Sequence, residues 1–518
     1  MEAASENARD VIDAPPLRAE PDVSNLATGA SVTLLGKVGG RGIYVLGQII
    51  IARLLGPEAF GLYAIGWSLL RIFQATTSLG LHNGVIRFGA RHHQDDPASL
   101  KGVVLQSLAV GLAASILAGV AVFLAAPWLE DLFGEPGLAP VVQGFAVAIP
   151  LATGLKVASA ATRIAQRMQY SVLAEDVAQP AISFVLVVAF FLFGWRLAGA
   201  VAADVASFVV SFVLILFFLR RVFPAVFAPR IRPRFYTREM LFFSLPTTLV
   251  GVFPLLTTWA DRLFIGYFRP SAEVGVYQAL AQISIMFTII IRALNLTFTP
   301  MIADLYHRQE MGRLESLFRI STKWGLYLSM PVFLTICFAP QELLYVVFGA
   351  EYAGGGLPLV ILAIGQLINV GTGAVGMLLI MTGRQNRWLA LSAAALLTSI
   401  ALHLLLIPRL GLSGAALSTS IAVSGLYLGG LFDVRRSLKL WPYDRRGLKL
   451  LLAAAPAVAV LLLLRWLEPG SPFLLLLLMG LASFGLFGGT LLLLGLDDED
   501  REFMDLVRKR ITKQGRHL

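Results

Sequence analysis

Six cations of this sequence lie inside long apolar stretches, where charges are rare. They are Lys37, Arg41, Arg71, Lys156, Arg262 and Arg292. A charged side chain in the middle of a bilayer costs on the order of 3 kcal/mol on insertion scales, so it normally faces a partner or a wet cavity. Guanidinium groups suit phosphate because their fixed donors match two oxygens at once. If these stretches cross a membrane, the cations predict an anion-binding site within it.

Polar side chains accompany the cations at helical spacing. At 100° per residue, Lys37, Arg41 and Tyr44 share a narrow stripe of one helix face. The supporting polar residues on this and similar stripes are Tyr44, Gln48, Gln74, Ser78, Thr258, Gln278 and Gln282. Two carboxylates, Asp204 and Asp261, lie in comparable stretches. Either could bind a coupling proton or sodium ion, or pair with a nearby cation, and the sequence does not choose between these roles.

Some of these charges have a simpler interpretation. Arg262 and Lys156 lie toward the ends of their helices, so their side chains could reach the membrane interface instead. Arg41 and Arg71 are in mid-span and cannot easily do so. We interpret His403 as a buried, hydrogen-bonded histidine rather than a proton relay. The anion site therefore depends most on Arg41 and Arg71.

The elements that must position these side chains are membrane-spanning helices. The chain of 518 residues is 57% hydrophobic and only 14% charged, far from the composition of an average globular protein. Apolar runs of 18 or more residues predict an all-α polytopic membrane protein with about 14 transmembrane helices. The predicted spans are 31–54, 60–86, 102–125, 139–161, 173–193, 197–219, 241–266, 274–301, 322–339, 357–381, 388–407, 412–432, 448–467 and 472–495.

Loop charge predicts the orientation of these spans. The loops after even-numbered spans carry most of the Arg and Lys residues, including the run from Arg220 to Arg238. Such loops normally stay in the cytoplasm, which also places both termini there. The net charge of +10 is then a consequence of topology, and we do not expect nucleic acid as a partner.

A repeat divides the chain into two halves. Gly61-x-Tyr63 recurs as Gly275-x-Tyr277, an offset of 214, and Arg220-Arg221 recurs as Arg435-Arg436, an offset of 215. Six spans per half is an even number, so the two halves keep the same orientation around a central cavity. The predicted parts are a disordered cytoplasmic N-terminus (1–30), an N-lobe (31–221), a basic linker (222–240), a C-lobe (241–436), two extra helices (437–495) and a cytoplasmic tail (496–518), in which the basic stretch after Phe503 is interpreted as a helix on the membrane surface.

The turn from Leu54 to Ala64 (LLGPEAFGLYA) resembles the opening hairpin of the polysaccharide and oligosaccharide flippases. These are members of the multidrug/oligosaccharidyl-lipid/polysaccharide exporter superfamily. The resemblance implies a transporter of the bacterial inner membrane that moves undecaprenyl-pyrophosphate-linked sugar repeat units outward by alternating access. Such units serve O-antigen (lipopolysaccharide), capsule or exopolysaccharide biosynthesis, and transport would be coupled to Na⁺ or H⁺. The implied partners are the lipid-linked oligosaccharide, membrane lipids and a glycan polymerase.

Other functions fit less well. A peptidoglycan-precursor flippase is the nearest alternative, and a cation-coupled multidrug antiporter would require an acidic cavity. A membrane glycan polymerase or ligase would need a long outer loop with catalytic residues. The sequence shows no phosphate-binding GxxxxGK[ST] loop and no His/Cys cluster with metal-ligand spacing, so we expect neither an enzyme nor a metal site.

Overall fold

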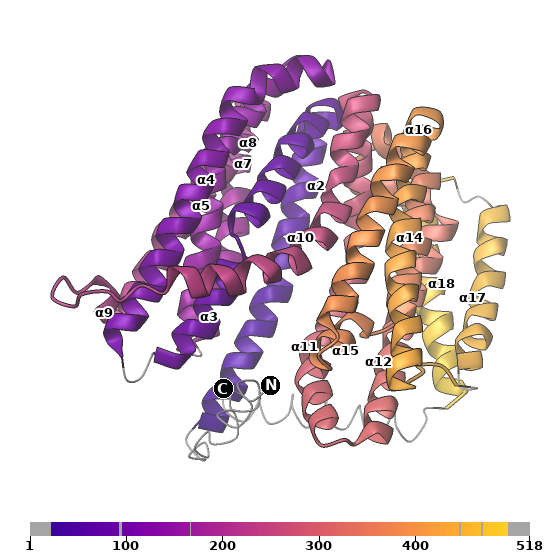
Figure 1. Cartoon of the computed structure of the whole chain (residues 1–518). Coiled ribbons are helices and arrows are strands. Elements are labelled where there is room, and N and C mark those ends of the chain that lie inside the picture. The colour runs from indigo at the N-terminus through magenta and orange to yellow at the C-terminus, as the bar shows by residue number, and fades with distance from the viewer. Residues whose placement is uncertain (1–21, 93–95, 166, 445–446, 468–469, 496–518) are drawn as a thin grey trace.

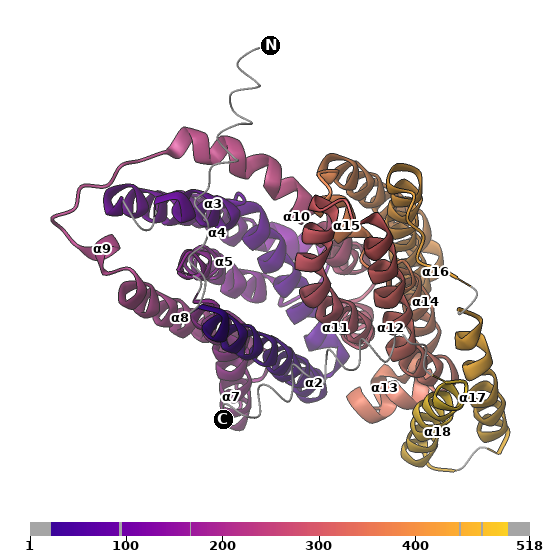
Figure 2. The ribbon, with the colours of Figure 1, turned by 90° about the horizontal axis from the view of Figure 1, so that it is seen from below.

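The computed structural model describes residues 22–92, 96–165, 167–444, 447–467 and 470–495. The described part is a bundle of long, roughly parallel helices in two lobes that lie side by side (Figure 1). Seen along the helix axes, the first lobe and the second lobe form separate groups, with the last two helices at the far edge (Figure 2). This arrangement agrees with the predicted all-α fold and its two halves.

The first lobe contains the helices up to the linker. They are α2 (Asp22–Thr77), α3 (Leu81–His92), α4 (Pro97–Phe133), α5 (Leu138–Arg163), α6 (Met168–Ser171), the π-helix η1 (Val172–Ala178), α7 (Gln179–Leu192), α8 (Arg196–Val222) and α9 (Pro224–Phe227). The start of α4 shows how local sequence sets these bounds. Asp96 accepts hydrogen bonds from the backbone N–H groups of Ala98 and Ser99, and Pro97 occupies the first turn.

The second lobe and the extra pair follow. They are α10 (Thr237–Phe268), α11 (Ser271–His307), α12 (Met311–Phe338), α13 (Pro340–Phe348), the 3₁₀ helix η2 (Ala350–Gly355), α14 (Gly356–Gly371), α15 (Val375–Met381), α16 (Gln385–Leu438), α17 (Leu448–Leu467) and α18 (Pro472–Leu493). The extra pair packs on α12 through apolar side chains such as Tyr327 and Phe487. Arg465 on α17 also forms an ion pair with Glu342 on α13.

Two of the long helices are hairpins. Gly56 in α2 and Gly411 in α16 have positive φ, a conformation that glycine adopts without steric cost. Gln48 and Tyr63 are 15 residues apart, which is about 22 Å along a straight helix, yet their side chains are hydrogen-bonded at 3.1 Å. The chain therefore doubles back at Gly56, and a contact between His403 and Thr419 shows the same at Gly411.

The number of membrane crossings can be compared with the predicted fourteen. Within the described residues, eleven helices are long and apolar enough to span a membrane, or twelve if the bent pair α12 and α13 is one span. That count treats each hairpin helix as a single span. The figure of fourteen stays a prediction.

The predicted N-terminal boundary differs from the structure. Helix α2 begins at Asp22, so residues 22–30 are helical rather than disordered. Extending an existing helix costs far less than nucleating one, and Leu26 and Ala27 are good helix formers. Residues 1–21 and the predicted surface helix in the tail after 496 lie outside the described residues.

We call the end of the bundle with Gly56 and Gly411 the hairpin end and the opposite end, with α9, the linker end. Buried side chains of both lobes join in one cluster, which includes Phe60 and Tyr63 of the first lobe and Tyr277 and Leu280 of the second. Toward the linker end each lobe has a cluster of its own. The ribbons accordingly converge at the hairpin end and separate toward the linker end (Figure 1).

The linker is bound to the first lobe. Lys101 donates a hydrogen bond to the Ala228 carbonyl at 2.5 Å, and the side chain of Gln106 accepts one from the Tyr236 backbone N–H at 2.8 Å. The Ser99 hydroxyl donates to Asp96 and, with the backbone N–H of Ser99, lowers the pKa of that carboxyl. The first turns of α10 continue across α3 and α4, so α10 connects the two lobes (Figure 2).

Candidate functional site

A chain of hydrogen bonds lies in the middle of the first lobe. Gln48 donates to the Tyr63 hydroxyl, which donates to Asp204 at 2.7 Å, and Ser183 donates to the other oxygen of Asp204 at 2.6 Å. Asp204 on α8 is only 2% exposed. Among the residues the structure describes, its hydrogen-bond partners are neutral. Because a buried carboxylate without a cation is costly, these hydroxyl donors are what stabilise it.

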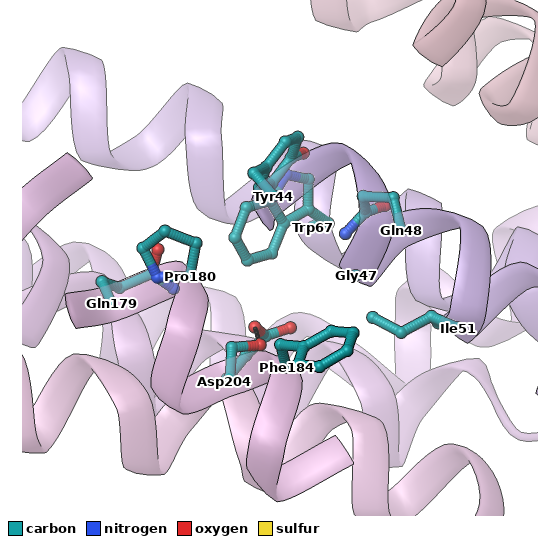
Figure 3. Close-up of a pocket in the computed structure, with 10 residues that line it drawn as sticks. Tyr44, Gly47, Gln48, Ile51, Trp67, Gln179, Pro180, Phe184 and Asp204 are labelled. Carbon is teal, nitrogen blue, oxygen red and sulfur yellow. Dashed lines mark hydrogen bonds between the residues drawn. The ribbon is translucent and has the colours of Figure 1, made fainter. Parts of the chain in front are cut away.

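A small cavity lies beside this carboxylate. Tyr44, Gln48, Gln179 and Asp204 are among the residues that line it, together with Pro180 and Phe184 (Figure 3). Its volume is about 10 Å³, which is room for about one water molecule. The side-chain oxygen of Gln48 is buried and has no hydrogen-bond partner among the described residues. The cavity therefore combines a carboxylate with an unpaired amide oxygen.

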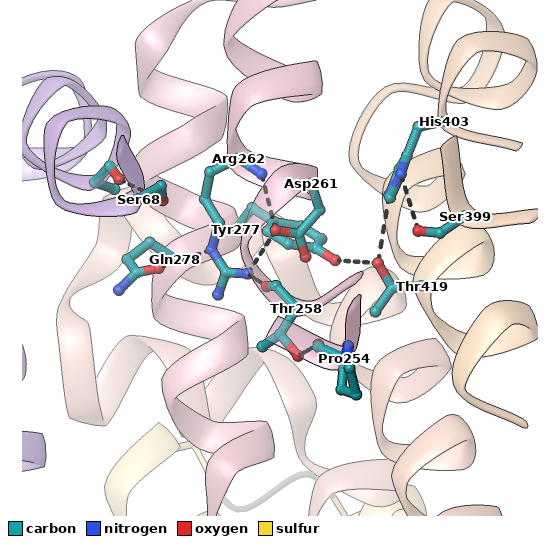
Figure 4. Close-up of polar contacts among 11 residues, drawn as sticks. Ser68, Pro254, Thr258, Asp261, Arg262, Tyr277, Gln278, Ser399, His403 and Thr419 are labelled. Atoms are coloured by element: carbon teal, nitrogen blue, oxygen red, sulfur yellow. Dashed lines mark hydrogen bonds and ion pairs between the residues drawn. The ribbon is translucent and has the colours of Figure 1, made fainter. Parts of the chain in front are cut away.

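The second lobe holds a different polar chain at its centre. Tyr277 is hydrogen-bonded to Thr419 at 3.2 Å, Thr419 to His403 at 3.4 Å, and His403 to Ser399 at 3.3 Å (Figure 4). His403 is fully buried and stacks on Phe264. This agrees with the interpretation of His403 as a buried, hydrogen-bonded side chain.

The second lobe also pairs its acid with a cation. Asp261 and Arg262 on α10 form an ion pair of 2.5 Å, and both are almost fully buried. Arg262 also donates to Gln278 at 3.0 Å and to the carbonyl of Thr258, and its guanidinium lies 5.4 Å from the centre of the Tyr277 ring. Arg262 is thus buried in the lobe, where Asp261, Gln278 and the Thr258 carbonyl accept from its guanidinium.

The two chains occupy equivalent places in the repeat. Tyr277 lies 214 residues after Tyr63, and Thr419 lies 215 after Asp204, which are the offsets of the repeat itself. In each lobe, therefore, the repeat-equivalent tyrosine contacts the repeat-equivalent residue of the corresponding helix. The sequence marks these tyrosines as landmarks of the repeat, but their hydrogen bonds, and those of Ser183 and Thr419, are apparent only in the structure.

Four of the predicted cations lie in the first lobe. The positive charges of Lys37 and Arg41 attract the carboxylate of Asp176, and the charge of Arg71 repels that of Lys156. Arg41 lies over the Tyr44 ring, 4.8 Å from its centre, and Arg71 donates to Gln74 at 2.8 Å. These side chains are half-buried. The helices α2 and α5 thus bring four cations into one region of one lobe.

Two acidic neighbours of these cations were not predicted from the sequence. The predicted interior acids were Asp204 and Asp261, but Glu175 on η1 interacts with Lys156, and Asp176 on η1 interacts with Lys37 and Arg41. Glu175 forms a 3.3 Å ion pair with Arg163. The sequence feature that indicates an irregular helix here is Pro180. A proline lacks the N–H that would donate to the carbonyl four residues earlier, which is that of Asp176.

The remaining predicted residues are more scattered. Gln74 donates to the Ala152 carbonyl, Ser78 donates to the Ala75 carbonyl, and Gln282 is buried with its side-chain oxygen unpaired among the described residues. Thr258 is exposed. The side chain of Arg292 lies outside what the structure describes. Of the five predicted cations whose side chains are described, four lie in the first lobe, and Arg262 is paired with Asp261 in the second.

The lobes contact each other at the hairpin end through paired glycines. Cβ atoms built on Gly61 and Gly275 would each lie about 3 Å from the backbone nitrogen of the other residue, and each would collide with a carbonyl of the opposite lobe. Glu135 accepts a hydrogen bond from the Ser271 N–H at 2.5 Å. From the second lobe, Tyr352 donates to the Ala52 carbonyl of the first lobe at 2.8 Å. The lobes are thus joined at this end by hydrogen bonds as well as by the paired glycines.

These features define a class of protein. Two repeated lobes of long apolar helices, joined at one end and carrying buried charges in their interiors, form the architecture of a polytopic membrane protein, and internal repeats of this kind are common among transporter folds. The model of the polysaccharide biosynthesis protein family matches residues 26–306, and the chain belongs to that family. The predicted resemblance is therefore confirmed at the level of the family.

Individual proteins extend this result. The capsular polysaccharide biosynthesis protein CapF of Staphylococcus aureus is 23% identical over 177 residues, which are 34% of this chain and 45% of CapF. The chain therefore matches less than half the length of that relative. The lipid II flippase MurJ in an inward closed conformation superposes with a TM-score of 0.68 at 13% identity over 88% of this chain and 97% of MurJ.

A second solved structure gives a similar result. An inward-facing multidrug resistance MATE transporter of the MOP superfamily has a TM-score of 0.67 at 17% identity and covers 77% of this chain and 94% of its own. At these identities the likeness shows the fold alone. The fold is thus one that flippases and drug transporters share.

Proposed function

We propose that this protein is a flippase that moves undecaprenyl-pyrophosphate-linked oligosaccharide units across the bacterial inner membrane for the synthesis of O-antigen, capsule or exopolysaccharide. The observation that carries this proposal is the group of four cations, Lys37, Arg41, Arg71 and Lys156, within membrane-spanning helices of one lobe. A pyrophosphate needs such groups to leave water, whereas a cationic drug would be repelled by them. A glycan polymerase would consume the product outside.

The mechanism is alternating access of the two lobes. The first lobe binds the pyrophosphate while the polyprenyl chain stays in lipid. Basic loops keep the linker end in the cytoplasm. Contacts between Gly61 and Gly275 close the hairpin end in this state, and their separation would open the path outward.

Ion coupling fits Asp204 better than Asp261. Asp261 already has a cation, Arg262, whereas the described hydrogen-bond partners of Asp204 are neutral and a cavity lies beside it. A proton or sodium ion bound at Asp204 would neutralise a charge that is otherwise buried. We therefore assign coupling to the first lobe.

The test is outward appearance of a lectin-detectable undecaprenyl-pyrophosphate oligosaccharide in proteoliposomes. Arg41→Gln and Arg71→Gln should each reduce the rate by roughly tenfold or more, because each removes a charge-assisted contact. Arg308→Gln is the matched control, since Arg308 is an exposed arginine paired with Asp304. Undiminished transport in both variants would contradict the cationic site.

Controls on the substrate separate the alternatives. If wild-type protein moves lipid II but no other lipid-linked glycan, it is a peptidoglycan-precursor flippase. Export of a cationic dye without glycan transport would instead indicate a multidrug antiporter. Asp204→Asn should abolish the dependence of transport on the ion gradient while leaving glycan binding intact.

A further inference from the structure

The π-helix η1 carries two adjacent carboxylates into the region of the four cations. Glu175 forms an ion pair with Arg163 at 3.3 Å, and Arg163 also donates to Ser171 at 3.2 Å. Glu175 also attracts the ammonium group of Lys156, and Lys37 and Arg41 attract the carboxylate of Asp176. Both carboxylates therefore lie within electrostatic reach of the cations that we assign to the pyrophosphate.

The backbone around these acids is specially built. Pro180 cannot donate to the carbonyl of Asp176, and the chain before it is a seven-residue π-helix instead of an α-helix. That carbonyl points at Gly40 of α2, where any side chain would collide with it. Helix α2, with Lys37 and Arg41, is thereby held against η1. Such π-helical segments recur at functional sites, and here one places acids against the binding groups.

We propose that Glu175 and Asp176 are built-in competitors of the substrate's anionic head group. With no substrate bound, they neutralise part of the charge of Lys37, Arg41, Lys156 and Arg163. A pyrophosphate displaces them, and their return to the cations promotes its release. This inference rests on the proposed function, because it concerns how the same cations release the anionic head group.

The density of charge explains why release needs help. Among the described residues, Glu175 and Asp176 lie beside Lys37, Arg41, Lys156 and Arg163 in a half-buried region. In a medium of low dielectric constant several cations together bind an anion strongly. A transporter that binds its substrate too tightly turns over slowly. Internal carboxylates weaken binding without removing the specificity for an anion.

The test is a pair of measurements on Glu175→Gln. Binding of farnesyl pyrophosphate, a short polyprenyl pyrophosphate, is measured in nanodiscs, and outward transport is measured in proteoliposomes. We expect binding roughly tenfold tighter, a lower half-saturating substrate concentration and a lower maximal rate. A merely structural ion pair would not give this combination. Farnesol, which lacks phosphate, should bind equally to both proteins.

Matched variants complete the test. Asp433→Asn breaks the Arg387–Asp433 ion pair of 2.6 Å on α16 and should change neither binding nor transport. If Glu175→Gln does not fold, Glu175→Asp, which retracts the carboxylate, should shift both quantities in the same direction by less.

The outcomes that overturn each proposal differ. Unchanged or weaker farnesyl pyrophosphate binding by a folded Glu175 variant would overturn the competitor role while leaving the flippase intact. Absence of binding and of glycan transport in the wild-type protein would overturn the proposed function itself.

Discussion

Each lobe has a buried tyrosine at the equivalent position of the repeat, but the two tyrosines have different hydrogen-bond partners. Tyr63 donates to a carboxylate, Asp204, whereas Tyr277 is hydrogen-bonded to a hydroxyl, Thr419. The second lobe has its acid on another helix, next to Arg262. One lobe thus buries a carboxylate among neutral partners and the other buries a neutralised pair. The repeat preserves the scaffold of the polar chain while its charge differs.

This difference between the two buried acids predicts different responses to ions. A carboxylate with neutral partners can change its charge by binding a proton or a metal ion, whereas a close ion pair resists such a change because the remaining cation would be left alone. We therefore expect the first lobe to respond to ions and the second to keep a constant charge. The following variants test the contrast, from the largest expected effect to the smallest.

Arg262→Ala should be the most damaging. It leaves the buried Asp261 without its cation, which costs roughly 3–5 kcal/mol of unfolding free energy. Asp261→Asn combined with Arg262→Gln should recover most of this loss. Asp204→Asn should cost less, because one of the two hydroxyls of Tyr63 and Ser183 can still donate to the amide oxygen while the other accepts from the amide nitrogen. Unfolding of the purified variants in detergent measures all three. If Arg262→Ala were as stable as wild type, Asp261 would not be a buried carboxylate.

Leucine at Gly61 or Gly275 should prevent the lobes from meeting at the hairpin end. Any side chain there would collide with a carbonyl of the opposite lobe. Cysteines at positions Glu135 and Ser271, introduced in a background without the native cysteine, should cross-link readily in the parent and fall to background in Gly61→Leu. Gly39→Leu is the control, since a Cβ there has open space. Persistent cross-linking would show that the paired glycines do not determine closure.

The two tyrosines should differ in energetic weight. Tyr63→Phe removes a donor to a carboxylate and should cost about 1.5–3 kcal/mol, whereas Tyr277→Phe removes a bond between neutral groups and should cost about 0.5–1.5 kcal/mol. Unfolding free energies of the single variants give the comparison directly. Equal losses would indicate that Asp204 is protonated in the resting protein, which would remove the contrast between the lobes.

Arg53→Ala should have the smallest effect. This exposed side chain donates to the carbonyls of Val346 and Val347 across the hairpin end. Exposed contacts of this kind contribute about 1 kcal/mol or less, so stability should hardly change. The Glu135–Ser271 cross-link should nevertheless form more slowly. An effect as large as that of Gly61→Leu would mean that the hydrogen bonds of Arg53, rather than the paired glycines, hold the lobes together.

The sequence predicted the fold better than the site. Apolar length and the repeated Gly-x-Tyr predicted the all-α fold and its two lobes, because both depend on patterns along the chain. Arg262 was placed at the membrane interface as an alternative, since nothing in the sequence reveals that Gln278 and the Thr258 carbonyl take up its donors. Glu175 and Asp176 were missed because a π-helix changes which side chains share a face. Pairings between distant helices cannot be read from the spacing of one helix.

The paired glycines also show the symmetry of the contact between the lobes. Gly61 contacts Gly275, and these two residues are equivalents in the repeat, so each meets its own counterpart across the contact. That is the pattern of an interface between two identical subunits related by a twofold axis. In a symmetric pair of six-helix subunits, any substitution would appear on both sides at once. Joining the halves in one chain allows the two sides to differ, as Asp204 and Thr419 do.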